Sequence, residues 1–251
     1  MAEQDGIIKL KGRIGDLTFF KTKDGYQARK VGGVTASRIA NDPRFQRTRE
    51  NMAEFGRAGK ASKHLRTAFK ALTNQLGDKK LSIRLTRAML KVIQADAIND
   101  RGLRMVLDAE TEMLTGFEFN EQSHVNSTLS VSYVSNIDRL SGIGKISFDT
   151  FSAKDMLYSP PGSTHFKFIL AAALVDFTNE TYLLDVTETA MLDVKSTNIP
   201  ATILNCNLPP ISTSPIFLLL GIAFYQSVNG HDYPLSNGAF NGLSIVNVNG
   251  V

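Results

Sequence analysis

The string Gly56-Arg57-Ala58-Gly59-Lys60-Ala61-Ser62 comes nearest to a chemical motif in this chain, because glycines beside a lysine can hold a phosphate group. A phosphate-binding loop needs a glycine, four further residues and then Gly-Lys-Ser/Thr, and it follows a strand. Here Glu54 stands where the first glycine is needed and Ala61 follows Lys60, within a stretch of helical periodicity. We therefore interpret these small residues as a helix contact and not as a nucleotide site.

The histidines and the cysteine form no catalytic or metal-binding pattern. The four histidines lie 60, 41 and 66 residues apart, without a His-x-x-x-His pair or a neighbouring cysteine. Cys206 alternates with polar neighbours as a strand residue does, which predicts a small buried thiol. His231 and Asp232 follow each other in an expected loop, but no nucleophile accompanies them. We therefore expect no enzyme, no metal and no cofactor, and an enzyme using His231, His165 or Cys206 is the least favoured hypothesis.

Charge is distributed very unevenly along the chain. Residues 1 to 104 hold 23 Lys and Arg against 10 Asp and Glu, whereas residues 105 to 251 hold 5 against 14. A segment with such an excess repels itself and favours a partner of opposite sign. That partner can be nucleic acid or the acidic half of another copy of the chain, and we favour the other copy.

Several of the basic residues form a stripe on an expected helix. At 100° per residue, five of them span about 120° of the helix circumference, namely Arg57, Lys60, Lys63, Arg66 and Lys70. Such a stripe fits a solvated helix face, an acidic protein partner or nucleic-acid phosphates, but no aromatic residues are interleaved on this face as in many nucleic-acid sites. Together with basic residues nearer the N-terminus, the candidate contacts with another subunit or a polyanion are Lys21, Lys23, Arg29, Arg47, Arg57, Lys60, Lys63, Arg66 and Lys70.

The N-terminal region that carries the first of these residues predicts a β-hairpin. Residues 7 to 31 contain β-forming residues on both sides of Lys23-Asp24-Gly25, and Asp-Gly is a strong turn signal. The hairpin is rich in Lys and Arg, and two isolated strands are marginal in water. It is therefore expected to act as an arm that completes its sheet elsewhere, and Gly32-Gly33 ends it.

Two helices are expected to follow this arm. Asn41-Asp42-Pro43 is a helix start, with Asp42 able to accept from free amide hydrogens and Pro43 in the first turn. A long amphipathic helix should run from Phe45 to near Gly77, kinked or closely approached at Gly56 and Gly59, and a second from about 79 to 99 makes an αα-hairpin. The apolar positions of the first helix are Phe45, Met52, Phe55, Leu65, Phe69, Leu72 and Leu76.

From Gly116 onward short β-rich runs alternate with turns, as in an antiparallel β-sandwich. The chain is thus expected to be α+β, with a basic arm and αα-hairpin in residues 1–115 and an acidic β-sandwich-like domain in residues 116–251. The expected strands lie near residues 118–119, 128–134, 145–149, 165–177, 182–187, 202–208, 216–226 and 243–248.

The sequence predicts no membrane span and no secretory signal. The longest apolar runs, 168–177 and 216–225, reach about ten residues, half of what a membrane helix needs. The first six residues are acidic and polar, unlike the start of a signal peptide. We therefore expect synthesis in the cytoplasm and no membrane partner.

Five strings of this chain stand out in combination, namely residues 11–20 (KGRIGDLTFF), 23–26 (KDGY), 47–51 (RTREN), 54–60 (EFGRAGK) and 164–166 (THF). Together they resemble a family of uncharacterised proteins of about this length encoded in Bacteroidota genomes. The resemblance implies a source and no activity, ligand or site.

Charge and organisation together favour a structural function. We expect a self-assembling, virion-like subunit of a homopolymeric tube, filament, sheath or shell, in which the arm contacts a neighbouring copy. Such an assembly includes phage- or tail-like structures. The alternative is a nucleic-acid-binding module that uses the basic helix stripe.

Overall fold

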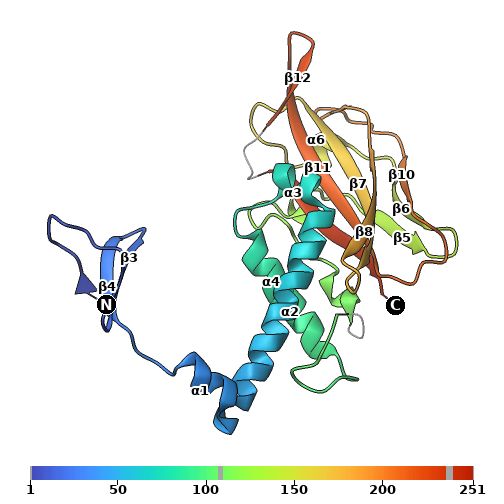
Figure 1. The fold of residues 1–251 in the computed structure, drawn as a ribbon. Helices are drawn as coiled ribbons and strands as arrows, with labels where there is room; N and C mark the ends of the chain where they lie inside the picture. The colour runs from blue at the N-terminus through green and yellow to red at the C-terminus, as the bar shows by residue number, and fades with distance from the viewer. Residues whose placement is uncertain (1, 107–109, 236–239, 251) are drawn as a thin grey trace. The chain divides into compact units, whose positions relative to one another are not determined.

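The computed structural model describes residues 2–106, 110–235 and 240–250, and it contains helices and several antiparallel sheets (Figure 1). The mixed α+β class expected from the sequence is confirmed. Contacts between residues divide the chain into two compact units, Met1–Arg49 and Glu50–Val251. We call the first unit the arm and the second the body. This division differs from the boundary expected between residues 115 and 116.

The arm contains a four-stranded antiparallel sheet in the order β1-β4-β3-β2. Strands β3 and β4 pair along their full length on either side of Lys23 and Asp24, and Gly25 has a φ of 123° at the end of this turn. A glycine is favoured there because other residues rarely adopt positive φ. The strands are β1 (Ala2–Glu3), β2 (Gly12–Ile14), β3 (Leu17–Thr22) and β4 (Gly25–Lys30).

Two short helical segments complete the arm. The hydroxyl oxygen of Thr35 caps α1 (Ala36–Asn41) by accepting from the N–H of Arg38 at 3.3 Å. Asp42 Oδ1 accepts from the N–H of Arg44 at 3.0 Å, as expected of a helix cap. It caps the 3-10 turn η1 (Pro43–Phe45), which leads into the long helix α2 (Gln46–Ala68).

Helix α2 differs from the expected helix in its length and in its buried face. It ends at Ala68, and α3 (Lys70–Leu76) begins after Phe69, whose φ of −102° and ψ of 20° interrupt the helix. Met52 and Phe55, expected on the apolar side, are 60% and 58% exposed. The buried residues of α2 are Glu54, Ala58, Ala61, Ser62, Leu65 and Ala68.

The glycines of α2 neither break the helix nor contact another backbone. The helix runs through Gly56 and Gly59, and a Cβ atom at either position would meet nothing within 4 Å. Instead, α4 (Leu81–Ala95) lies beside α2 at its small polar residues, where Thr86 Oγ1 donates to Ser62 Oγ at 3.1 Å (Figure 1). The close contact expected at the glycines is therefore made by the alanine and serine face.

The centre of the body is a six-stranded antiparallel sheet. Its two long neighbouring strands are β7 (His165–Asp176) and β11 (Ile216–Val228). β13 (Gly242–Asn249) and β12 (His231–Pro234) pair with successive parts of β11. β8 (Thr181–Glu188) and the short β9 (Leu192–Asp193) pair with β7.

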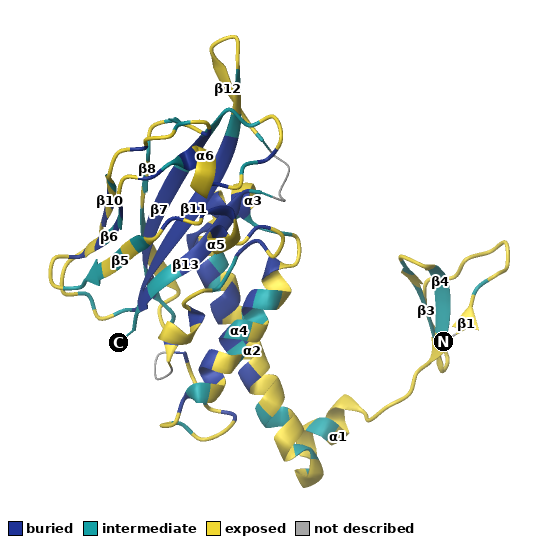
Figure 2. Ribbon diagram, turned by 180° about the vertical axis from the view of Figure 1, so that it is seen from behind, coloured by how far each residue is buried: buried dark blue, intermediate teal, exposed yellow. Residues whose placement is uncertain are grey.

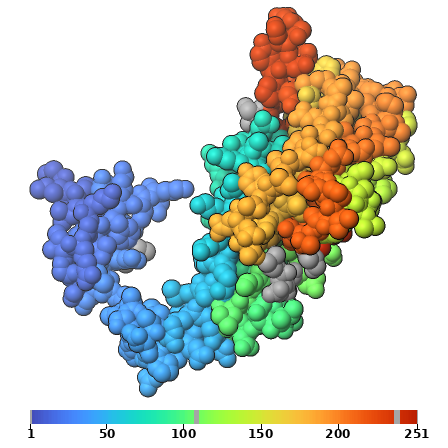
Figure 3. All heavy atoms as spheres, turned by 45° about the vertical axis from the view of Figure 1, so that its right-hand side comes forward, coloured from blue at the N-terminus to red at the C-terminus, as the bar shows by residue number. Residues whose placement is uncertain are grey.

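Both faces of this sheet are covered. On one face, Leu65 of α2 and Leu85 of α4 share a core with Phe217 of β11. On the other face lies a three-stranded sheet of order β10-β6-β5, and Phe148 stacks on Phe168 of β7 with ring centroids 4.4 Å apart. Figure 3 shows outer atoms of the later part of the chain, in orange, directly against those of the helical part, in cyan. The helices thus belong to the same unit as the strands.

The remaining elements are short or lie in the three-stranded sheet. That sheet consists of β5 (Tyr133–Asp138), β6 (Ile143–Phe148) and β10 (Thr202–Asn207). The short helical turns are η2 (Thr111–Leu114), α5 (Val125–Thr128) and α6 (Ala153–Met156).

Two of the expected strands differ from the structure. Glu118 makes an isolated bridge with Ser244, and no longer strand forms there among the described residues. Residues 125–128 form α5, and the next strand, β5, begins at Tyr133 and not at Thr128. The alternation that predicted a strand from Thr128 reflects burial of Leu129 and Val131 in an irregular segment.

No helix among the described residues is long and apolar enough to cross a membrane.

The shared core predicts that helices and sheets of the body unfold together. Leu65→Ala should reduce the free energy of unfolding by about 2–5 kcal/mol, because it leaves a cavity in a fully buried site. Urea unfolding followed by helix and sheet signals should show one transition for both. Leu140→Ala removes the same atoms from a side chain that is 77% exposed and should change stability little. Separate melting of the helices would instead support a boundary near residue 115.

Candidate functional site

The structure distributes the nine candidate contact residues over both units. In the arm, Lys21 lies in β3, Lys23 in the turn and Arg29 in β4, while Arg47 is in the first turn of α2. The others lie in the body, where Lys63, Arg66 and Lys70 line one groove and Arg57 and Lys60 line a different pocket. The basic stripe that the sequence predicts on one helix is therefore divided between two cavities.

The strand register gives the arm sheet one apolar and one polar face. Alternate residues of a strand point to opposite faces, and directly paired residues share a face. The apolar face, with lysines at its margin, is formed by Ile14, Leu17, Phe19, Lys21, Tyr26, Ala28 and Lys30. The opposite face is formed by Arg13, Thr18, Phe20, Thr22, Gln27 and Arg29.

Neither face of the arm sheet is covered within the arm. None of the described residues 2–49 is buried, and Figure 2 shows no dark blue along strands β1, β3 and β4. Ile14 is 61% exposed and Leu17 44% exposed on the apolar face. On the same face, Lys21 Nζ lies 5.4 Å from the centre of the Tyr26 ring. The arm thus has a regular sheet without a hydrophobic core.

In the body, Arg57 has a structural contact. Its Nε donates to the carbonyl oxygen of Arg104 at 2.7 Å, and its Nη2 donates to that of Gly102. The N–H of Gly102 in turn donates to the buried carboxylate of Glu54 at 2.8 Å. Arg57 and Glu54 thus fix the segment after α4 against α2, which leaves Arg57 less available to a partner.

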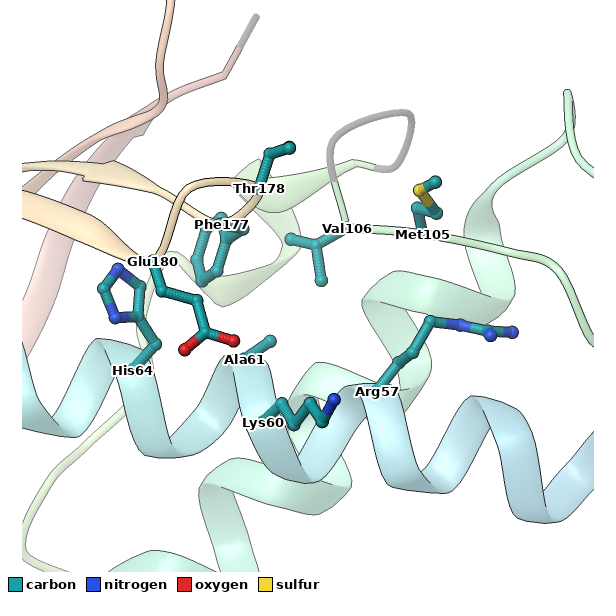
Figure 4. A pocket seen from close by; sticks show the side chains of 9 residues that line it. All are labelled: Arg57, Lys60, Ala61, His64, Met105, Val106, Phe177, Thr178 and Glu180. Carbon is teal, nitrogen blue, oxygen red and sulfur yellow. The ribbon is translucent and has the colours of Figure 1, made fainter.

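A small pocket of about 260 Å³ lies beside Arg57 (Figure 4). Its apolar wall includes Ala61, Val106 and Phe177. The nearby His64 ring nitrogen Nε2 lies 3.1 Å from the carbonyl oxygen of Thr181. Because the His64 imidazole is engaged by a backbone carbonyl, we interpret the pocket as an apolar contact site and not as a site of proton transfer. It is lined by Arg57, Lys60, Ala61, His64, Met105, Val106, Phe177, Thr178 and Glu180.

The cysteine is placed as the sequence predicts. Cys206 is buried, and its Sγ lies 3.4 Å from the carbonyl oxygen of Leu170. Burial raises the pKa of the Cys206 thiol to about 11, so that it is protonated at neutral pH.

The two histidines considered for catalysis lie in separate strands of the body and have different neighbours. His165 Nδ1 lies 2.9 Å from the Thr164 hydroxyl, and His231 lies in strand β12 and not in a loop, beside Tyr233. Among the described residues, no group of three or more His, Cys, Asp or Glu residues could hold a metal ion.

Part of the charge asymmetry is balanced inside the body. Residues 50 to 104 hold 12 Lys and Arg against 5 Asp and Glu, and they form one unit with the acidic residues 105 to 251. The body therefore has a net charge of −2, while residues 1 to 49 have 11 Lys and Arg against 5 Asp and Glu, a net charge of +6. The excess of positive charge therefore lies in the arm and not in the whole N-terminal half of the chain.

Sequence reasoning did not identify Asp96, a buried carboxylate just after α4. It accepts from the N–H groups of Ile98, Asn99 and Met105 at 2.9–3.0 Å. Burial alone opposes ionisation, but these hydrogen bonds outweigh it and lower the pKa of Asp96. The sequence Asp96-Ala97-Ile98-Asn99 contains a helix-end turn signal, although nothing in it shows the contact with Met105.

No protein-family model and no curated protein sequence matches this chain.

Replacement of the buried Asp96 carboxylate should lower the stability of the protein and change how that stability depends on pH. Asp96→Asn should reduce the free energy of unfolding by about 1.5–3 kcal/mol, since it weakens hydrogen bonds to a buried charged group. Because the pKa of Asp96 is lowered on folding, its contribution is complete above its ordinary pKa of 3.8 and decreases as pH falls below it. Urea titrations from pH 7 to acid should therefore show a smaller acid loss in the variant. Asp100→Asn, at an exposed position nearby, is the matched control.

Proposed function

We propose that this protein is a self-assembling structural subunit, in which the arm of one copy docks on the body of a neighbouring copy. The product is a homopolymeric tube, filament, sheath or shell, and phage- or tail-like assemblies belong to this class. The observation that supports this function is that none of the described residues 2–49 is buried, although residues 2–30 form a sheet with an apolar face. We further interpret the two sheets of the body as a sandwich-like core that presents a rigid docking surface.

An uncovered sheet of this size has little stability of its own. Small sheets need a packed apolar face to be stable in water, and a chain segment of this length lacks the material for a core. Covering the apolar face contributes about 25 cal/mol for each Å² removed from water. A binding partner that covers the apolar face therefore supplies the hydrophobic contacts that the arm lacks.

Charge favours another copy of the chain as this partner. The arm has a net charge of +6, while the body has −2, and residues 105 to 251 alone have −9. Attraction between unlike surfaces of two identical molecules produces head-to-tail contacts, which close into rings or continue as helical filaments. The exposed segment 31–34, with Gly32 and Gly33, allows the sheet to turn toward a neighbour.

Nucleic-acid binding along the helix stripe is the less favoured function. The stripe is interrupted where Arg57 donates to two backbone carbonyls, and its other members line two separate cavities. Binding along a nucleic-acid backbone needs a continuous row of lysines and arginines, which neutralise the phosphates and release their counterions.

Two adjacent phenylalanines test the docking face. Phe19 points to the apolar face and Phe20 to the opposite face, under the guanidinium of Arg29. Phe19→Ser should abolish assembly measured by light scattering and negative-stain microscopy, because it places a hydroxyl in the contact. Phe20→Ser, which makes the same chemical change, should leave most assembly intact. Wild-type protein that stays monomeric at high concentration and low salt would refute the proposal, and equal loss in both variants would show that the apolar face is not the contact.

Salt should weaken assembly. At about 0.1 M salt charges are screened beyond about 10 Å, and at 1 M beyond about 3 Å. The critical concentration for assembly, measured by sedimentation, should therefore rise with sodium chloride. Lys21→Glu with Lys30→Glu, both at the margin of the apolar face, should raise it at low salt. Lys91→Glu with Lys154→Glu makes the same charge change at exposed positions of the body and should have a smaller effect. A critical concentration that is independent of salt would contradict the electrostatic part of the proposal.

A further inference from the structure

A groove of about 480 Å³ opens where the end of α2, α3 and the start of α4 meet in the body. Three separate segments supply its positive charge, since Lys63 and Arg66 come from α2, Lys70 from α3 and Lys79 from the turn before α4. This volume lies within the range of small-ligand sites. The groove is thus a concave basic surface and not only a charged helix face.

The positive charge of the groove has no partner in the described part of the chain. None of the four cations forms an ion pair there. Asp78, the carboxylate that lines the groove, accepts instead from Arg84 and from the N–H groups of Lys80 and Glu121. Although burial opposes ionisation, these bonds lower the pKa of Asp78, so that it is ionised and already bonded.

Two further features favour an anion in the groove. The first residues of α4, Leu81 and Ser82, line it, and α4 has neither a side-chain cap nor an acidic residue in its first turn. A 15-residue helix presents partial positive charge at such an end, although the N–H groups of Leu81 and Ile83 there donate to the carbonyl oxygens of Asp78 and Lys80. In addition, the Nε of Arg66 is buried without a hydrogen-bond acceptor among the described residues. The partly exposed guanidinium of Arg66 adds its charge to the positive potential of this helix end.

We propose that this groove binds a compact anion that carries two or more phosphate groups. Four cations exceed what a single carboxylate or sulfate would balance, and Asn74 and Ser82 add neutral donors. The hydroxyls of Thr67 and Thr73 donate back to helix carbonyls and contribute little. Arg57, the next arginine toward the start of α2, already donates to a backbone carbonyl, so that an extended nucleic acid would not gain it as a further contact. This site does not depend on self-assembly.

The test is a calorimetric titration of the full chain with inorganic triphosphate at about 50 mM salt, where electrostatic binding is strong. Binding should be saturable, with one site per chain. Lys63→Gln with Lys70→Gln should weaken it by about tenfold or more, since each lysine makes a charge-assisted contact. Arg87→Gln with Lys91→Gln removes the same charge from an exposed part of α4 outside the groove and should change affinity less than about twofold, as expected of screened surface charges.

A second variant tests the helix end directly. Ser82→Asp places a carboxylate in the first turn of α4, where it should raise the melting temperature of the free protein and abolish triphosphate binding. A higher melting temperature with unchanged binding would overturn the proposal, because the anion would then lie elsewhere.

Three other outcomes would also overturn the proposal. One is the absence of triphosphate binding, and another is an equal loss of affinity in the groove and control variants. The third is binding of a single-stranded oligonucleotide or of an acidic protein by these residues without binding of triphosphate.

Discussion

The structure of the body depends on the burial of two neighbouring strands on both faces. Eight of the twelve residues of β7 and the first nine residues of β11 are buried. A strand buried on both faces needs a covering layer on each side, as in layered α/β proteins. Here Leu65 and Leu85 of the helices cover one face, and Phe148 of the three-stranded sheet covers the other. Neither layer can be removed without exposing the centre.

This requirement determines which surfaces remain for binding. The helices bury their alanine, serine and leucine positions against each other and against the sheet, and Lys63 and Lys70 remain exposed. The groove formed by Lys63, Arg66 and Lys70 is thus a consequence of how the helical layer covers the sheet. The arm is a separate unit, and none of its described residues is buried. Its apolar sheet face is therefore not covered within the arm.

The sequence predicted what local patterns determine and missed what distant contacts determine. The expected strands at 165–177 and 216–226 and the expected helix from about 79 to 99 correspond to β7, β11 and α4. The first half of α2 was misjudged because Glu54 is buried, and its carboxylate is satisfied by the N–H of Gly102, 48 residues away. Lys79 was missed as a groove residue because the groove is formed by three segments, whereas the stripe was read along one helix.

The physical roles of charge and apolar surface in the arm differ in range. Attraction between a unit of +6 and an oppositely charged surface acts over about 10 Å at 0.1 M salt, but it specifies neither face nor orientation. Contact between apolar side chains acts only when water is excluded, and it distinguishes Phe19 from Phe20 on opposite faces of one strand. In the proposed assembly, charge therefore governs how fast two copies meet, and the apolar face determines how they stay together. A sheet with lysines at the margin of its apolar face combines both properties in about 30 residues.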